Sequence, residues 1–325
     1  MREVVELLAG AQRVTAFCHE NPDADTLGAA LAIAIAAERL GKQAEVVSWD
    51  PPAPFLDFLP RIGTVRRTPA LEPDVAVVLD AGELHRIGKV LEERADWFAS
   101  ARVANIDHHV SNPGFGQAVW IEPKAAATCE MVARLLPELG VSIDPELATC
   151  LMAGIVQDTH TFAHANATPR TLRVSADLLE AGAALSSINR AIYADKPFST
   201  LALWGLILAG CAAAAAGRIV HASMTTAMLA ATAEQPSSAE GFVDLLGSTR
   251  DADVTILFKE QGPAEVRVSV RTTARADAVV IAGAFGGGGH PRAAGCTLHV
   301  PLVDAQALVL AEAERELMRD DARSR

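Results

Sequence analysis

Short apolar runs that end in acidic or histidine residues constrain the fold of this chain more than any other feature. The run Val75–Leu79 is followed by Asp80, and the run Val103–Ile106 is followed by the triplet Asp107–His109. Such runs are typical of strands in a parallel sheet whose active site lies at the carboxyl ends of its strands. The pattern therefore predicts an α/β fold with a polar site at one edge of a parallel sheet.

Two more clusters fit this pattern. His19, Asp23 and Asp25 follow the run Arg13–Cys18, and Asp158 closes an apolar segment after Val156. If the clusters meet at one sheet edge, they supply four carboxylates and two imidazoles: His19, Asp23, Asp25, Asp80, His108 and Asp158. Hard divalent ions prefer such ligands. Two ions held about 3.5–4 Å apart can activate water and stabilise a displacement at phosphorus, so we expect a binuclear metal site.

Each cluster also has a simpler explanation. Asp23 and Asp25 could form a turn and a helix cap, Asp80 could belong to an ordinary strand-to-loop turn, and His108 with His109 could lie on the surface. Asp158 is harder to explain, because burying an unpaired carboxylate is costly. The metal interpretation accounts for all the clusters together, and we favour it for that reason.

The motifs resemble those of the Asp-His-His phosphoesterase family. The resemblance is carried, in order, by residues His19–Gly28, Asp80, Asp107–His109 with Asn112, and Gly154–Thr159. Near the end of the chain, Gly286–His290 followed by Ala293–Gly295 is similar to the signature of the family's associated substrate-binding domain. The resemblance covers almost the whole chain. It points to the compact NrnA-like branch of oligoribonucleases and 3′-phosphoadenosine 5′-phosphate (pAp) phosphatases, and not to the longer RecJ exonucleases.

The resemblance implies a role for each motif residue. One metal ion would be held by His19, Asp23 and Asp80, and the other by Asp25, Asp80, His108 and Asp158. The ions would be Mn²⁺, with Mg²⁺ or Co²⁺ as alternatives. Asp107 and Asn112 would position a histidine, and His109 would lie near the scissile phosphate. The residues expected to act in catalysis are His109, Asp80 and His108.

The resemblance also implies a substrate site in the second domain. Arg271 would contact a substrate phosphate, since guanidinium recognises phosphate in a bidentate way. Consecutive glycines can present a nest of backbone amides to an anion, so we expect substrate contacts from Gly286, Gly287, Gly288, Gly289 and His290. Arg292 is either a second contact or a surface residue. His160 stands where relatives often have glycine, and we expect it not to bind metal.

The element pattern predicts a doubly wound parallel-sheet domain and a smaller mixed α/β domain, with the active site in the cleft between them. We expect the metal-binding domain at residues 1–195, a connecting helix or linker at 196–216, and the substrate-binding domain at 217–325. Helices are expected at Thr26–Leu40, at Thr128–Leu136 with Thr128 as cap, from Pro145 through Asp158, and at Val174–Tyr193, Ser238–Leu246 and Leu302–Met318. The apolar stretch Leu201–Ala216 is expected to be a buried helix, because a membrane span needs about 20 apolar residues.

Composition limits the partners. The formal net charge is −12, whereas a protein that neutralises many phosphates should be basic. Short single-stranded oligoribonucleotides or small nucleotides are therefore expected, and duplex nucleic acid and membranes are not. The five cysteines have no paired spacing, and the charged first residues do not fit a secretory segment, so a cytoplasmic location is expected. A homodimer is compatible with the sequence.

The resulting hypothesis is a metal-dependent phosphoesterase. It would use a hydroxide activated by two metals to cut short oligoribonucleotides to mononucleotides, with pAp and cyclic or linear dinucleotides as further candidate substrates. The sequence does not rank these substrates. The alternatives are an inorganic pyrophosphatase-like hydrolase, which needs a more basic pocket, and a non-catalytic nucleotide sensor, which would be expected to lack metal ligands.

Overall fold

A computed structural model describes residues 1–323, which divide into two compact units. The first unit comprises Met1–Asp195 and the second begins at Lys196. Each has its own hydrophobic core. Within residues 1–323, no helix combines the length and the apolar character needed to cross a membrane.

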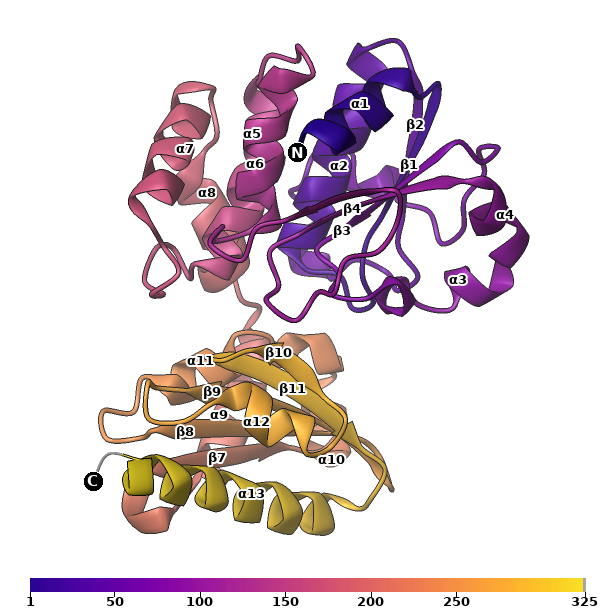
Figure 1. The fold of residues 1–325 in the computed structure, drawn as a ribbon. Coiled ribbons are helices and arrows are strands. Elements are labelled where there is room, and N and C mark those ends of the chain that lie inside the picture. Colours follow the sequence, from indigo (N-terminus) through magenta and orange to yellow (C-terminus); the bar gives the residue numbers. More distant parts are fainter. Residues whose placement is uncertain (324–325) are drawn as a thin grey trace. The chain divides into compact units, whose positions relative to one another are not determined.

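The first unit is built on a parallel sheet in the order β2-β1-β3-β4-β5 (Figure 1). Its strands are β1 (Arg13–Phe17), β2 (Gln43–Val47), β3 (Val75–Leu79), β4 (Arg102–Asp107) and β5 (Ala118–Ile121). The chain order reverses between β1 and β3, because β2 lies on one side of β1 and β3 on the other. In open α/β sheets, ligands bind at the carboxyl ends of the strands at such a switch point.

Helices cover both faces of this sheet. The helices are α1 (Arg2–Gly10), α2 (Ala24–Arg39), α3 (Val90–Glu93), α4 (Ala95–Ser100), α5 (Thr128–Glu138), α6 (Pro145–Asp158), α7 (Pro169–Glu180) and α8 (Leu185–Asn189). One face packs Val14, Val77 and Ile106 against α2, α5 and α6, and the other packs Phe17 and Val78 near Trp97 of α4. The expected doubly wound domain is confirmed.

The second unit contains a mixed sheet in the order β10-β11-β9-β8-β7-β6. Its strands are β6 (Ala212–Ala214), β7 (Ile219–Met224), β8 (Val254–Gly262), β9 (Glu265–Thr272), β10 (Gly288–His290) and β11 (Ala293–Leu298). Its helices are α9 (Phe198–Ala209), α10 (Thr226–Thr232), α11 (Phe242–Gly247), α12 (Ala278–Gly283) and α13 (Leu302–Arg323). Figure 1 shows α13 lying along one face of this sheet, and Val309 and Ala313 of α13 are buried in its core.

Three expected helices differ in the structure. The stretch Leu201–Ala216 is not one buried helix: α9 ends at Ala209, the alanines pair with β7 as the edge strand β6, and Leu201 is 53% exposed. The region expected as a linker thus forms elements of the second unit. Val174–Tyr193 is broken at Gly182, whose φ of +105° favours glycine. The expected helix Ser238–Leu246 is interrupted at Glu240, which is extended.

Candidate metal centre

The candidate site lies at the switch point of the first sheet, where residues that follow β1, β3 and β4 meet Asp25 of α2 and Asp158 of α6. Asp80 directly follows β3 and takes a left-handed φ of +58°. A residue with a Cβ adopts this conformation at a cost, and such strain is often found at functional sites. The conformation goes with a carboxylate that lies between two histidines: Asp80 Oδ2 is 3.4 Å from His19 Nε2, and Asp80 Oδ1 is 3.3 Å from His108 Nε2.

Two groups of potential ligands share this carboxylate. In the group His19, Asp23 and Asp80, and again in the group Asp25, Asp80 and His108, the ligand atoms all lie within 4.8 Å of one another. Asp158 lies beside the second group, with Oδ2 3.2 Å from His108 Nε2. The structure therefore brings all six sequence-predicted ligand residues together in the first unit, with Asp80 common to both groups.

The hydrogen bonds of His19 and His108 direct the Nε2 atom of each ring at the carboxylates. His19 Nδ1 lies 2.8 Å from the carbonyl oxygen of Glu20, and His108 Nδ1 lies 3.2 Å from that of Ala125. A carbonyl oxygen only accepts, so Nδ1 carries the proton in each ring and Nε2 is directed at the carboxylates. An outer hydrogen bond of this kind fixes the orientation of metal-binding imidazoles in proteins.

Asp25 is the most deeply buried of the expected ligand carboxylates, with an exposed fraction of 0%. Its two oxygens accept hydrogen bonds from the backbone amides of Thr128 (2.6 Å) and Cys129 (2.8 Å) at the start of α5. The expectation that Thr128 caps α5 is therefore wrong: Thr128 is the first helical residue, and its hydroxyl donates to Asp80 Oδ1. The amino end of α5, with its partial positive charge, thus supports Asp25 and Asp80.

Asp23 combines both roles that were considered for it. Its Oδ1 accepts from the amides of Asp25 and Thr26 as the cap of α2, and it lies 3.7 Å from His19 Nε2. Cys18, next to His19, is buried in the core, and its thiol lies 3.8 Å from the carbonyl oxygen of Thr26. Burial raises the pKa of the Cys18 thiol, which disfavours the thiolate form that a nucleophile needs.

The buried carboxylates of the site repel one another, and bound cations would neutralise this excess negative charge. Burial, and then the charges of Asp80 and Asp158, raise the pKa of Asp25 well above its ordinary value. Burial also raises the pKa of Asp158, to about 6, although His108 opposes this. For His108, burial lowers the pKa, but the hydrogen bonds and charges of Asp158 and Asp80 outweigh it and leave the pKa well above the ordinary value. This donor set fits hard divalent cations.

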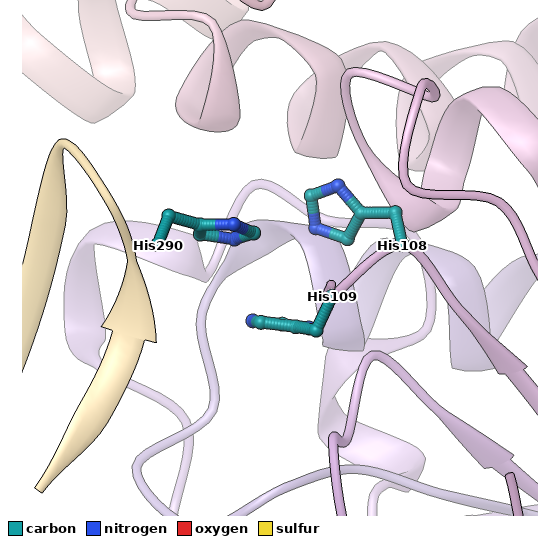
Figure 2. A group of neighbouring side chains, drawn as sticks. All are labelled: His108, His109 and His290. Atoms are coloured by element: carbon teal, nitrogen blue, oxygen red, sulfur yellow. The ribbon is translucent and has the colours of Figure 1, made fainter. Parts of the chain in front are cut away.

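His109 lies beside the shared carboxylate, with Nδ1 3.7 Å from Asp80 Oδ1, and its ligand atoms lie within 4.8 Å of those of Asp80 and Asp107. Its Nδ1 lies 2.7 Å from Asp107 Oδ1, which also accepts from the amides of His108 and His109. Asn112 Nδ2 donates to Asp107 Oδ2 at 2.6 Å and to the carbonyl oxygen of Ala81. Figure 2 shows the imidazoles of His108 and His109 side by side, and their ring centroids are 5.0 Å apart. Asp107 thus orients His109, and Asn112 holds Asp107.

The residues expected to bind substrate lie in the second unit. Arg271 on β9 pairs with Asp244 of α11, with Nε 2.6 Å from Oδ1. Arg292 Nη1 donates to the carbonyl oxygen of Ala276 at 2.8 Å, which gives it a structural contact. His290, which Figure 2 also labels, ends β10 and faces Ala293 in the register with β11.

The expected nest of four glycine amides is not what the structure shows. The amides of Gly286 and Gly287 donate to carbonyl oxygens of α12, and Gly288 and Gly289 form strand β10. The glycines instead permit close packing, because a Cβ at Gly287 would lie 2.2 Å from the carbonyl oxygen of Gly295.

One feature of the first unit was missed by the sequence reasoning. Gly154 of α6 packs against Asp25, and a Cβ there would lie 2.4 Å from Asp25 Oδ1. Gly154 stood in a motif, but its contact joins residues far apart in sequence. The one signal in the sequence was a glycine in each of the two expected helices, Gly28 and Gly154, because glycines allow two helices to approach closely.

Comparison with known proteins identifies the family of the chain. Residues 13–155 match the model of the DHH family, N-terminal domain, and residues 220–318 match the DHHA1 domain. The chain is 35% identical over 323 residues to the bifunctional oligoribonuclease and PAP phosphatase NrnA of Thermus thermophilus, covering 98% of this chain and 95% of the relative. It is 25% identical over 289 residues to the protein of the same name from Bacillus subtilis, covering 86% of this chain and 88% of the relative.

A solved structure shares the fold. The exopolyphosphatase-related protein from Bacteroides fragilis matches with a TM-score of 0.88 and 22% identity, over 98% of this chain and 97% of that chain. At this identity the likeness shows the fold alone.

Proposed function

Because the chain belongs to the DHH family and is a phosphoester hydrolase, we propose that it cuts short oligoribonucleotides to mononucleotides and removes a phosphate from pAp. The observation that carries the proposal is the carboxylate of Asp80, which is shared by two ligand groups at the switch point of the sheet. Linear dinucleotides derived from cyclic signals are further candidate substrates. The relatives from Thermus thermophilus and Bacillus subtilis are named for oligoribonuclease and PAP phosphatase activities.

We assign two divalent ions, Mn²⁺ in the first place, to the shared centre. His19, Asp23 and Asp80 would hold one ion, and Asp25, Asp80, His108 and Asp158 the other. When bound, such ions supply an activated water and neutralise charge that develops at phosphorus. The carboxylates and the Nε2 atoms of the two histidines are the donors that suit Mn²⁺ or Mg²⁺.

His109 is assigned to the reacting phosphate. Its Nδ1–H is directed to Asp107, so the Nε2 atom is the end that can meet a substrate. The carboxylate of Asp107 also favours the protonated ring, and a protonated His109 could donate a hydrogen bond to a phosphate oxygen as negative charge builds up there. Burial lowers the pKa of His109, but Asp107 and Asp80 raise it above its ordinary value, which supports this role.

Arg271 and His290 are assigned to the substrate in the second unit. The guanidinium of Arg271 is held by Asp244 and has Nη atoms with which it can meet a phosphate. The glycines contribute indirectly, because they let β10 pack closely against β11 and so position His290.

Charge favours short substrates. With a net charge of −12, the chain has little capacity for the many phosphate contacts of duplex or long single strands. We also place the reaction in the cytoplasm, since Cys18, Cys129, Cys150, Cys211 and Cys296 are all free thiols.

The test is hydrolysis of a substrate panel with added Mn²⁺. The panel contains a labelled RNA dinucleotide, a long RNA, pAp, cyclic di-AMP and pyrophosphate. We expect mononucleotides from the short RNA and phosphate from pAp, with little action on the long RNA. Activity on pyrophosphate alone would replace the proposal with a pyrophosphatase, and metal binding without any hydrolysis would point to a sensor.

A further inference from the structure

The turn that follows α6 holds non-glycine residues in a conformation that favours glycine. His160, Thr161 and Phe162 have φ values of +47°, +54° and +65°. A side chain with a Cβ pays for this conformation in free energy, whereas glycine does not. Two of these residues have contacts that offset the strain: Thr161 bonds to Asn189 through its hydroxyl at 2.5 Å, and Phe162 packs against the core of the unit.

His160 has a different environment. It is half-buried, and its ring contacts two other rings. It stacks on His164, with centroids 5.3 Å apart and an angle of 16° between planes, and it meets Tyr193 edge-on at 4.6 Å. The hydroxyl of Tyr193 donates to the carbonyl oxygens of Val156 and Gln157, both at 3.1 Å, which fixes that ring at the end of α6. His164 is exposed.

These rings lie close to the candidate metal centre and are linked to it through Asp158. Asp158, two residues before His160, has its carboxylate 3.2 Å from His108 Nε2. The carbonyl oxygen of Asp158 lies 3.3 Å from His164 Nδ1 and accepts from Asn166 Nδ2. Asn166 also donates to the carbonyl oxygen of Ala126, and the adjacent residue Ala125 is the one whose carbonyl oxygen meets His108 Nδ1. The stacked pair is therefore held at a fixed place beside the ligand Asp158.

We propose that the stacked rings of His160 and His164 form a platform for the nucleobase of the nucleotide whose phosphate is at the metal centre. The inference rests on the proposed function and adds a specificity site to it. A planar aromatic surface with one exposed ring suits a base, because every base has a π-face that stacks on aromatic side chains. Such a platform tolerates different bases but requires that a base be present.

The test compares an RNA dinucleotide with a matched dinucleotide in which one nucleoside lacks its base, both in the presence of Mn²⁺. In the wild-type enzyme, the abasic compound should have the higher KM. His160→Gly should raise the KM for the normal dinucleotide about 5- to 150-fold, the range for loss of one stacked base. It should leave the abasic compound within about twofold of wild type. His164→Ala should act in the same direction, and His160→Phe, which keeps an aromatic face, should retain a low KM.

Thermal unfolding separates this role from a structural one. Because glycine adopts a φ of +47° without strain, His160→Gly should keep or raise Tm. A lowered Tm with unchanged KM would show that the ring only supports the turn, and an equal loss on both dinucleotides would show that it serves the phosphate or the metals. Either result overturns the platform. If the wild-type enzyme cleaves neither dinucleotide nor pAp, the proposed function itself fails, and the platform with it.

Discussion

Gly154→Ala tests whether close packing of α6 against Asp25 shapes the metal centre. The new Cβ would lie 2.4 Å from Asp25 Oδ1 and 2.5 Å from Cys129 Sγ, where ordinary contacts begin at 3.4 Å. Asp25 or the helix must therefore move about 1 Å. Asp25 is poorly able to do so, because both of its oxygens accept amide hydrogen bonds from the start of α5.

Two effects on stability oppose each other in this variant. Overpacking a core costs about 1–3 kcal/mol, and replacing a helical glycine by alanine returns about 1 kcal/mol. The free energy of unfolding should therefore fall by about 0–2 kcal/mol. Activity should fall much more, about 100-fold, because a displacement of about 1 Å in a catalytic group has an effect of that size.

The assay measures bound metal, hydrolysis of the RNA dinucleotide and urea unfolding on the same protein. Gly205→Ala on α9 is the matched control, since a Cβ at that position meets nothing within 4 Å. The control should gain up to about 1 kcal/mol and keep wild-type activity. Wild-type activity and full metal content in Gly154→Ala would refute the packing argument.

Three further variants have expected outcomes. Glu130→Ala removes a fully buried acceptor of hydrogen bonds from Ala126 N and from the side chains of Thr171 and Arg170. Urea unfolding should show that the free energy of unfolding falls by about 1–3 kcal/mol. An unchanged unfolding midpoint would contradict a stabilising role for these hydrogen bonds. Burial lowers the pKa of Lys259 from 10.5 to about 8. Between pH 8 and 10.5 the unfolded chain therefore binds more protons than the folded chain, so the free energy of unfolding should rise with pH in that window. Lys259→Met should abolish this rise. If the rise in stability with pH persists in Lys259→Met, another group is responsible for it. Arg271→Ala should raise the KM for short RNA without changing metal content, whereas loss of metal would contradict its assignment to substrate.

The architecture of the first unit could be predicted because its signals are local. Strands β1, β3 and β4 are largely apolar and lead into the motifs of His19, Asp80 and His108, and parallel strands bring their ends to one edge. That rule alone placed Asp80 and His108 near each other. The contact between Gly154 and Asp25 could not be predicted, since it depends on how closely α6 approaches α2.

The errors in the second unit have a common cause. Alanine has a high helix propensity, yet Ala212–Ala214 pair with β7 as an edge strand, so tertiary pairing prevailed over local preference. The glycines from Gly286 onward were expected to bind an anion through their amides. The amides of Gly286 and Gly287 donate instead to α12, and Gly288 and Gly289 pair with β11, which composition does not reveal.

The most direct test of the shared-carboxylate centre is hydrolysis of a labelled RNA dinucleotide by wild type and by Asp80→Asn at saturating Mn²⁺. The amide keeps the size of the side chain but removes the charge that both ligand groups share, so unfolding should show a folded protein. The shared centre predicts a rate at least about 100- to 1,000-fold below wild type. Full activity in Asp80→Asn, with the same metal content, would contradict it.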